Sequence, residues 1–196
     1  MEAILNFDLS VFRFVENYIW NPVLDVIMPI ITYLGEGGAV WIAIALALII
    51  SKKYRKCGVA MALGLIGSLV VVDWIIKPIV ERPRPFNLEA WEGIFNYPEL
   101  VGKPSSWSFP SGHSSSSLAA SVALLCTNKK FGIPAVILGL LIAFSRIYVH
   151  VHYPTDVIVG IIVGAILGVI AAYISKRYYP SLENKIRMRK AAKNEK

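Results

Sequence analysis

The chain contains only two cysteines, and charged residues make up just 17% of its 196 residues. Cys57 and Cys126 both fall near ends of apolar runs that we assign below to the cytoplasmic face, where thiols stay reduced, so we expect no disulfide. The N-terminus has no basic leader followed by a small-residue cleavage site, which argues against a removable signal peptide. The alternation of polar and apolar residues typical of a transmembrane barrel is also missing.

Long hydrophobic runs are what the chain does have. Hydrophobic residues account for 56% of the sequence, the mean hydropathy is +0.57, and several runs reach the roughly 20 residues that a helix needs to cross a bilayer. We therefore predict an all-α fold, a polytopic membrane helix bundle of about six transmembrane helices. Residues 1–178 would form one membrane-embedded domain, and residues 179–196 a basic cytoplasmic tail.

The apolar runs also predict where the spans lie. Residues 1–20 mix apolar and charged residues as an amphipathic helix at an interface does. Residues 22–34 are apolar but short, so they form either a poor span that continues the first helix or a partial insertion. The clear spans are 39–51, 57–80, 110–127, 131–149 and 155–178. Gly160, Gly164 and Gly168 recur every fourth residue in the last span, which favours a tight helix crossing.

Positive charge gathers on one side of this topology. The chain has 20 Lys and Arg against 13 Asp and Glu, and 14 of the cations fall in the loop Lys52–Lys56, at Lys129 and Lys130, or in the tail from Lys176 onward. Alternate loops share one membrane face, and the positive-inside rule makes that face cytoplasmic. The tail therefore serves topology near anionic lipid, and we expect no nucleic acid partner.

Residues 81–109 form an outer-face loop of unusual length, in which four prolines exclude a long helix. Its aromatic residues form either an interfacial belt or a lid over a binding site. They are Phe86, Trp91, Phe95, Tyr97, Trp107 and Phe109.

Three polar groupings fall at the outer ends of the spans. They are Lys77 with Arg82 and Arg84, then Ser111-Gly112-His113 after Pro110, then Arg146 with His152 and Asp156. An ionisable group that faces lipid costs at least a few kcal/mol, so this coincidence needs a reason. The surplus of cations predicts an anion, and a helix opening at Ser111 and Gly112 offers backbone N–H groups to hold it. Phosphate is the natural candidate.

The spacing of the acids and histidines suggests chemistry as well as binding. His152 and Asp156 are four residues apart and would share a helix face, where the carboxylate is close enough to hold one imidazole N–H. The other ring nitrogen would then be free to attack or to take a proton. Asp73 and Lys77 have the same spacing and predict a helical ion pair. His150 would face elsewhere and make a lone polar contact. A metal site is disfavoured, because the group is rich in cations and both cysteines lie on the other side.

The motifs resemble the three signatures of the type 2 phosphatidic acid phosphatase family of membrane lipid phosphatases. The matching residues are Lys77 and Arg84-Pro85, then Pro110-Ser111-Gly112-His113, then Ser145-Arg146, His152 and Asp156. The resemblance implies a metal-independent enzyme that works through a phosphohistidine and needs no cofactor. It also implies His152 as the nucleophile, Asp156 as the residue that orients it, and His113 as the acid for the leaving group. The residues implied to hold the phosphoryl oxygens are Lys77, Arg84, Ser111, Gly112 and Arg146. The family assigns no role to Arg82, which could extend the basic rim.

We therefore expect an integral lipid phosphatase of the cell inner membrane, with its active site on the extracytoplasmic side and its C-terminus in the cytoplasm. Its substrate would be a phosphate monoester or diphosphate of a lipid that enters sideways from the bilayer. Undecaprenyl diphosphate is slightly preferred over phosphatidylglycerophosphate or phosphatidic acid. The alternative from another class is a non-enzymatic anion or lipid-phosphate transporter, which would need neither a nucleophile nor an acid.

Overall fold

The computed structural model describes residues 2–87 and 99–194, with side chains as far as Tyr179. Its helices are α1 (Glu2–Phe14), α2 (Pro22–Leu34), α3 (Ala39–Ile50), α4 (Arg55–Ser68), α5 (Lys77–Val80), α6 (Gly112–Thr127), α7 (Lys129–Tyr148) and α8 (Pro154–Asn194). Wider π-helical turns extend α1 over Val15–Ile19 and join α4 to α5 over Leu69–Ile76, and 3-10 turns occupy Glu36–Gly38 and Pro85–Asn87. No strand occurs in the two described ranges, and the predicted all-α fold is confirmed.

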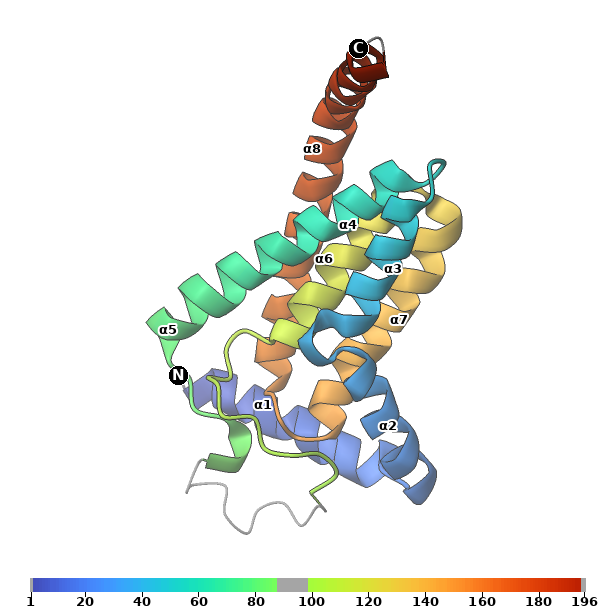
Figure 1. The fold of residues 1–196 in the computed structure, drawn as a ribbon. Coiled ribbons are helices and arrows are strands. Elements are labelled where there is room, and N and C mark those ends of the chain that lie inside the picture. The colour runs from blue at the N-terminus through green and yellow to red at the C-terminus, as the bar shows by residue number, and fades with distance from the viewer. Residues whose placement is uncertain (1, 88–98, 195–196) are drawn as a thin grey trace.

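Helix α6 lies at the centre of a bundle that α3, α4, α7 and α8 complete (Figure 1). Small residues make this position possible, since Ser114, Ser115, Ala119 and Ala120 are all fully buried. Without large side chains on α6, its neighbours approach its backbone closely. The first turn of α6, which carries Gly112 and His113, is only partly buried.

The predicted glycine face of α8 is the contact with α6. A Cβ atom at Gly160 would lie 2.7 Å from the Ser111 carbonyl oxygen, and one at Gly168 would lie 2.8 Å from the Ala119 carbonyl oxygen. A Cβ atom at Gly164 would overlap the backbone of Ser115. Larger residues at these positions would push the two helices apart.

Large apolar side chains cover the outside of the bundle. Ile66 on α4, Ile137 on α7 and Ile166 on α8 are each more than half exposed, a surface that suits lipid rather than water. Among the described residues, three helical segments are long and apolar enough to cross a membrane, and the pair α2 and α3, bent by 46°, could form a fourth. Helix α6 is shorter, with 16 residues. The membrane helix bundle is confirmed, whereas the count of six spans stays a prediction.

The N-terminal segment is a helix that lies across one end of the bundle (Figure 1). On α1, Asp8 and Phe12 are fully buried, while Phe7 and Phe14 are about half exposed. The segment ends where the sequence predicted, because the Asn21 side chain accepts hydrogen bonds from two backbone N–H groups at the start of α2. The structure thus separates residues 1–20 from the helix α2, which begins at Pro22.

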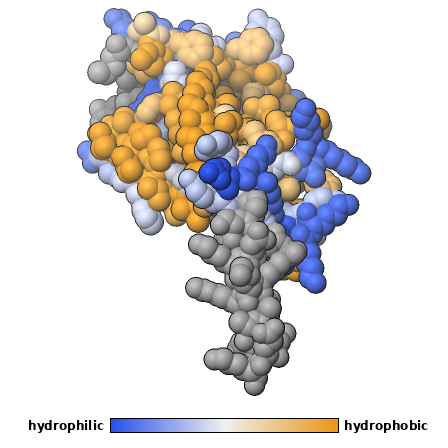
Figure 2. All heavy atoms as spheres, turned by 90° about the horizontal axis from the view of Figure 1, so that it is seen from above, coloured by the Kyte–Doolittle hydropathy of each residue, from blue (hydrophilic) through white to orange (hydrophobic). Residues whose placement is uncertain are grey.

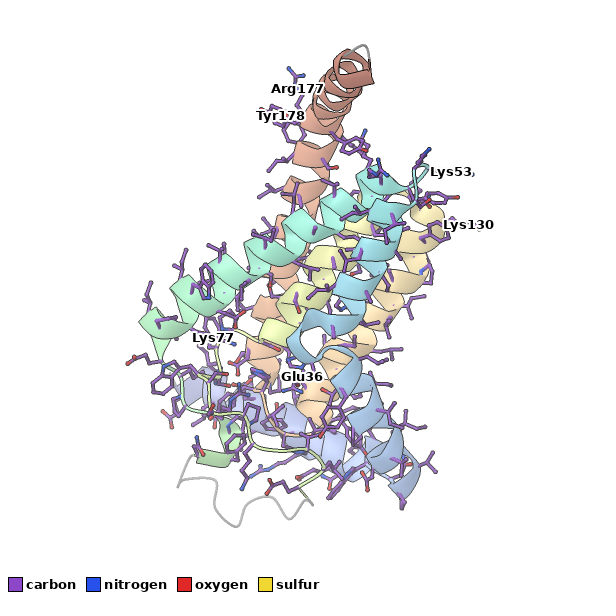
Figure 3. The ribbon with its side chains drawn as sticks, viewed as in Figure 1. Glu36, Lys53, Lys77, Lys130, Arg177 and Tyr178 are labelled. Carbon is purple, nitrogen blue, oxygen red and sulfur yellow. The ribbon has the colours of Figure 1, made fainter. Side chains whose placement is uncertain are left out.

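Charged residues separate to the two ends of the molecule. Lys53, Lys130 and Arg177 lie at one end, and Lys77 and Glu36 lie toward the other (Figure 3). Seen from the first end, hydrophilic side chains gather beside α8 and hydrophobic ones cover much of the remaining surface (Figure 2). Helix α8 itself runs unbroken to Asn194, so the predicted basic tail continues the last helix.

Candidate active site

A cavity of about 470 Å³ opens at the end of the bundle that carries Lys77. Six of the eight predicted site residues line it together. They are Lys77, Arg84, Gly112, His113, Arg146 and His152. The other two, Ser111 and Asp156, are fully buried and lie behind the cavity wall. Residues from four separate parts of the chain, the ends of α4/α5, α6, α7 and the turn before α8, therefore meet at one site.

The turn between α7 and α8 places Arg146 and His152. Helix α7 ends in a Schellman motif, in which the N–H of His150 donates to Ile147 and the N–H of Val151 donates to Arg146. His150 takes the left-handed conformation that this motif needs, with φ of 55°. The N–H of His152 also reaches the Arg146 carbonyl, at 3.3 Å. The hydrogen bonds of one helix end thus hold the cation and the imidazole side by side.

His152 is only 2% exposed, and its two ring nitrogens face different partners. Nε2 lies 3.3 Å from Nη1 of Arg84, and Nδ1 lies 3.5 Å from Oδ2 of Asp156. A guanidinium only donates, so Nε2 is the acceptor and the ring proton is on Nδ1, facing the carboxylate. Burial, reinforced by the nearby cations Arg84, Arg146 and Lys77, holds the pKa of His152 well below its usual range. His152 is therefore neutral, with its lone pair on Nε2.

The carboxylate of Asp156 is oriented by three donors. Arg82 Nη1 donates to Oδ1 at 2.6 Å, while the Tyr153 N–H, at 3.1 Å, and the Ser108 hydroxyl donate to Oδ2. The sequence predicted that Asp156 would hold an imidazole N–H of His152. At 3.5 Å the pair is at ion-pair distance and longer than a hydrogen bond.

Arg84 is fixed by the backbone of two loops. Its Nε donates to the Ser106 carbonyl at 2.7 Å, its Nη1 to the Val151 carbonyl at 2.7 Å, and its Nη2 to the Ser106 hydroxyl at 3.0 Å. These acceptors hold the guanidinium plane against His152. Sequence reasoning missed Ser106 and Ser108, and their position before Pro110 in a serine-rich stretch was the only available signal.

Arg146 is 3% exposed and has spare hydrogen-bonding capacity. Its Nη1 donates to the Thr32 hydroxyl at 2.7 Å, whereas its buried Nε has no hydrogen-bond partner among the described residues. A buried donor without a partner costs about 1–3 kcal/mol. An anion in the cavity that Arg146 lines would remove that cost.

The first turn of α6 and Lys77 form the opposite wall. Lys77 pairs with Asp73 at 2.6 Å, as the spacing predicted. A Cβ atom at Gly112 would lie 3.2 Å from an Asp73 oxygen and 3.3 Å from the Lys77 Nζ, so a glycine lets this ion pair approach the start of α6. The Ser111 hydroxyl caps α6 and accepts from the hydroxyl of Ser114 at 2.9 Å. Ser111 thus shapes the helix end behind the cavity.

His113 has an acidic partner that sequence reasoning missed. Its Nε2 lies 3.3 Å from Oε2 of Glu36, which comes from the glycine-rich turn between α2 and α3. His113 and His152 line the same cavity. The imidazole of His113 therefore lies near the solvent-exposed carboxylate of Glu36, and that of His152 lies near the buried carboxylate of Asp156.

Arg82 does not line the cavity, contrary to the expected basic rim. Its guanidinium instead joins Asp156 to Asp8 of α1, at 2.6 and 2.7 Å. His150 also contacts α1, stacking on Phe12 with ring centroids 4.9 Å apart. The predicted aromatic residues Trp91, Phe95 and Tyr97 lie outside the described residues.

The lining of the cavity suits an anion. The cations Lys77, Arg84 and Arg146 line it together with two acids, Glu36 and Asp73. Asp73 is already paired with Lys77. The described residues contain no group of three or more His, Cys, Asp or Glu side chains that could hold a metal ion. Chemically, the arrangement can hold a phosphoryl group between cations, with a neutral imidazole on one side and a second imidazole nearby.

Beyond its charged end, the cavity continues as an apolar groove between α3 and α4. The residues of the groove are Ile42, Ala45, Leu46, Ile49, Ala62, Leu65, Ile66 and Leu69. A polar site that opens into an apolar groove fits an amphiphilic molecule, with its charged group in the site and its chain between the two helices.

Comparison with known proteins gives one consistent result. The sequence model of the PAP2 superfamily matches residues 54–179. An undecaprenyl-diphosphatase of Sulfolobus acidocaldarius is 31% identical over 160 residues, which cover 81% of this chain and 74% of that protein. Undecaprenyl-diphosphatase BcrC of Bacillus subtilis is 37% identical over 138 residues, covering 70% and 68%. The crystal structure of a transmembrane PAP2 type phosphatidylglycerolphosphate phosphatase from Bacillus subtilis superimposes with a TM-score of 0.70 at 26% identity, covering 90% and 88%.

Proposed function

The chain belongs to the PAP2 superfamily and is a phosphatase of that metal-independent family, and from this premise we propose that it releases phosphate from a membrane lipid through a phosphohistidine at His152. The observation that carries the proposal is the environment of His152. The ring is neutral, its Nε2 faces Arg84, and both residues line a cavity with the cations Lys77 and Arg146.

The proposed reaction has two steps. In the first, Nε2 of His152 attacks the phosphorus, a P–N bond forms, and the bond from phosphorus to the lipid oxygen breaks. His113 gives the leaving oxygen its proton. In the second step His113 takes a proton from water, the water oxygen attacks the phosphorus, and the P–N bond breaks to release inorganic phosphate. Arg84, Arg146 and Lys77 stabilise the charge on the phosphoryl oxygens in both steps.

The substrate is a lipid phosphate that enters from the bilayer. The apolar groove between α3 and α4 supports this proposal, because it connects the lipid-facing surface near Leu46 and Ile66 to the charged end of the cavity. Undecaprenyl diphosphate is the preferred substrate, because the two similar proteins from Sulfolobus acidocaldarius and Bacillus subtilis are undecaprenyl-diphosphatases. Phosphatidylglycerophosphate is the second candidate, favoured by the similar solved structure. Phosphatidic acid is a third candidate of the same chemistry.

The active site faces the extracytoplasmic side of the inner membrane, and the C-terminus lies in the cytoplasm. This orientation is supported by the basic residues Lys53, Lys130 and Arg177 at the end of the molecule opposite Lys77. Cysteine labelling on intact cells tests this orientation. Single cysteines are introduced at Lys53 and at Glu36 and are treated with a thiol reagent that does not cross membranes. Reaction at position 36 alone is expected.

The function is tested by phosphate release from the purified protein in detergent, with the three lipid phosphates as substrates and with and without a chelator. Release that is indifferent to the chelator is expected. His152→Ala should abolish turnover while leaving the elution profile and the unfolding temperature unchanged. A transporter, the alternative considered from the sequence, would release no phosphate, and full turnover by His152→Ala would refute the phosphohistidine.

A further inference from the structure

The guanidinium of Arg82 links α1 to the start of α8 behind the active site. One nitrogen, Nη1, donates to Oδ1 of Asp156 at 2.6 Å and to the hydroxyl of Thr155 at 2.8 Å. The other, Nη2, donates to Oδ2 of Asp8 at 2.7 Å. The guanidinium also lies over the ring of Tyr153, 3.7 Å from its centroid. A planar fork with several fixed acceptors has one orientation available to it.

Asp8 is the anchor of this arrangement on α1. It is fully buried, and beyond Arg82 it accepts from the N–H and the hydroxyl of Thr155, both at 2.9 Å. The same helix leaves Phe7 and Phe14 about half exposed. A buried charge is tolerated only when it is paired. The position of α1 is therefore set by Arg82 and Thr155, the partners of Asp8, rather than by burial of its two phenylalanines.

These contacts matter for the reaction because they fix the orientation of the Asp156 carboxylate. Arg82 binds its Oδ1, while Oδ2 faces Nδ1 of His152 at 3.5 Å. Because Asp8 holds Arg82 in place, the guanidinium cannot follow a rotation of the Asp156 carboxylate, and such a rotation would break the Arg82–Asp156 ion pair. The orientation of the imidazole at the reacting centre thus depends on a residue at the start of the chain.

We propose that Arg82 is a positioning residue for the reaction and that Asp8 holds it, so that the N-terminal helix α1 is part of the catalytic apparatus. This inference rests on the proposed function. The match to the PAP2 superfamily model covers residues 54–179, so Asp8 lies outside the matched segment. Neither Asp8 nor Arg82 lines the cavity, so each acts through Asp156 rather than on the substrate.

The test measures kcat and KM for Asp8→Asn, Arg82→Gln and Arg82→Lys with the best lipid phosphate. A misplaced catalytic group costs up to about 100-fold in rate, so we expect kcat to fall about 10-fold to 100-fold in Asp8→Asn and Arg82→Gln. KM should stay within about threefold, because Lys77, Arg84 and Arg146 still bind the phosphoryl group. Arg82→Lys should recover part of the kcat lost in Arg82→Gln, since a lysine keeps one contact but not the fork.

A double-mutant cycle shows whether the two residues act as one unit. The Asp8→Asn/Arg82→Gln double variant should be no slower than Arg82→Gln alone, because the single change has already broken the connection. Asp25→Asn is the matched control. Its carboxylate also comes from the N-terminal region and accepts from the Tyr148 hydroxyl at 2.7 Å, but among the described residues it makes no hydrogen bond or ion pair with Asp8, Arg82 or Asp156. Its kcat should match that of the wild type.

Stabilisation by inorganic phosphate separates positioning from misfolding. The rise in unfolding temperature on adding phosphate should be the same in wild type, Asp8→Asn and Arg82→Gln. Wild-type kcat in Asp8→Asn and Arg82→Gln would overturn the inference, and so would losses that add in the double variant or loss of the phosphate effect along with kcat. A wild-type protein that releases no phosphate from any lipid would instead overturn the proposed function, and the positioning role with it.

Discussion

Nη1 of Arg84 lies 3.3 Å from Nε2 of His152, so a permanent donor faces the nitrogen proposed to attack phosphorus. The contact fixes the tautomer, with the proton on Nδ1, and it places a cation beside the phosphoryl group that His152 would receive. An arriving phosphate oxygen can take this hydrogen bond from the imidazole. Arg84 would then hold the substrate with the same guanidinium that had oriented the ring.

We expect Arg84→Lys to lower kcat by about 100-fold, because a lysine is a point charge that cannot satisfy Ser106, Val151 and the phosphoryl group together. Arg55→Lys is the matched control, since the Arg55 side chain also donates to a backbone carbonyl, that of Ile49, but at the basic end of the bundle. Its kcat should be that of the wild type. Steady-state kinetics decide the matter, and equal activity in both variants would contradict the role of the Arg84 fork.

The role of His113 predicts a dependence on the leaving group. An alkoxide leaves only with a proton, whereas a nitrophenolate leaves without help. His113→Asn should therefore lose about 100-fold to 10,000-fold in kcat on an alkyl phosphate and much less on p-nitrophenyl phosphate. The ratio of the two rates is the measurement. A uniform loss on both substrates would mean that His113 binds phosphate rather than protonating the leaving oxygen.

Much of this site could be predicted because its residues recur at fixed spacings at the ends of apolar runs. Asp73 and Lys77 form the ion pair that their spacing predicted, and His150 was correctly separated from His152. The glycine face of α8 meets α6 as its repeat indicated. Each of these relations is local or belongs to one helix face, so the chain order alone determines it.

The relations that the sequence did not reveal are long-range. Asp8 is 74 residues from Arg82 and reads as one acid of an amphipathic helix until the fold brings α1 under α8. Thr32 and Glu36, the partners of Arg146 and His113, lie on a segment whose path the composition left open. Such partners are set by how α1 and α2 pack, and no spacing rule covers that.

The charge around His152 predicts how activity depends on pH. Only the neutral imidazole attacks, so activity is lost as the pH falls through the pKa of His152, which burial and three cations hold below the ordinary 6.5. Lys77→Gln removes one cation and raises that pKa, so the acid limb of kcat/KM should move to higher pH. Profiles on one substrate that extend well below pH 6.5, from about pH 4 to about pH 8, measure the difference, because the ionisation of the substrate is common to both proteins.

Lys129→Gln, at the basic end, is the control for the pH profile and should leave the acid limb in place. An acid limb that moves to lower pH in Lys77→Gln, or that does not move, would contradict the electrostatic account of His152. Lys77→Gln should also raise KM, since Lys77 lines the cavity that holds the phosphoryl group.

The crossing of α6 and α8 predicts a difference between two glycine substitutions. A Cβ atom at Gly164 would overlap the Ser115 backbone, whereas one at Gly67 of α4 would meet only a Leu167 methyl group at 3.6 Å. Gly164→Ala should destabilise the protein by about 1–3 kcal/mol and lower its unfolding temperature. Gly67→Ala should be neutral or stabilising, because alanine is the better helix former. Thermal unfolding in detergent compares them, and equal unfolding temperatures would mean that the two helices can separate at no cost.

The apolar groove between α3 and α4 predicts a chain-length effect. Ala62 lies in the groove, so Ala62→Phe should fill it and exclude several methylene groups of a lipid tail, at about 0.8 kcal/mol each. We expect KM for a long-chain lipid phosphate to rise at least about 10-fold, while a short-chain analogue that reaches only the charged end is hydrolysed normally. Ala165→Phe makes the same change on α8, outside the cavity lining, and should affect neither substrate. If Ala62→Phe hydrolysed both substrates as the wild type does, the lipid tail would have to lie elsewhere, and the groove would have no part in recognising the substrate.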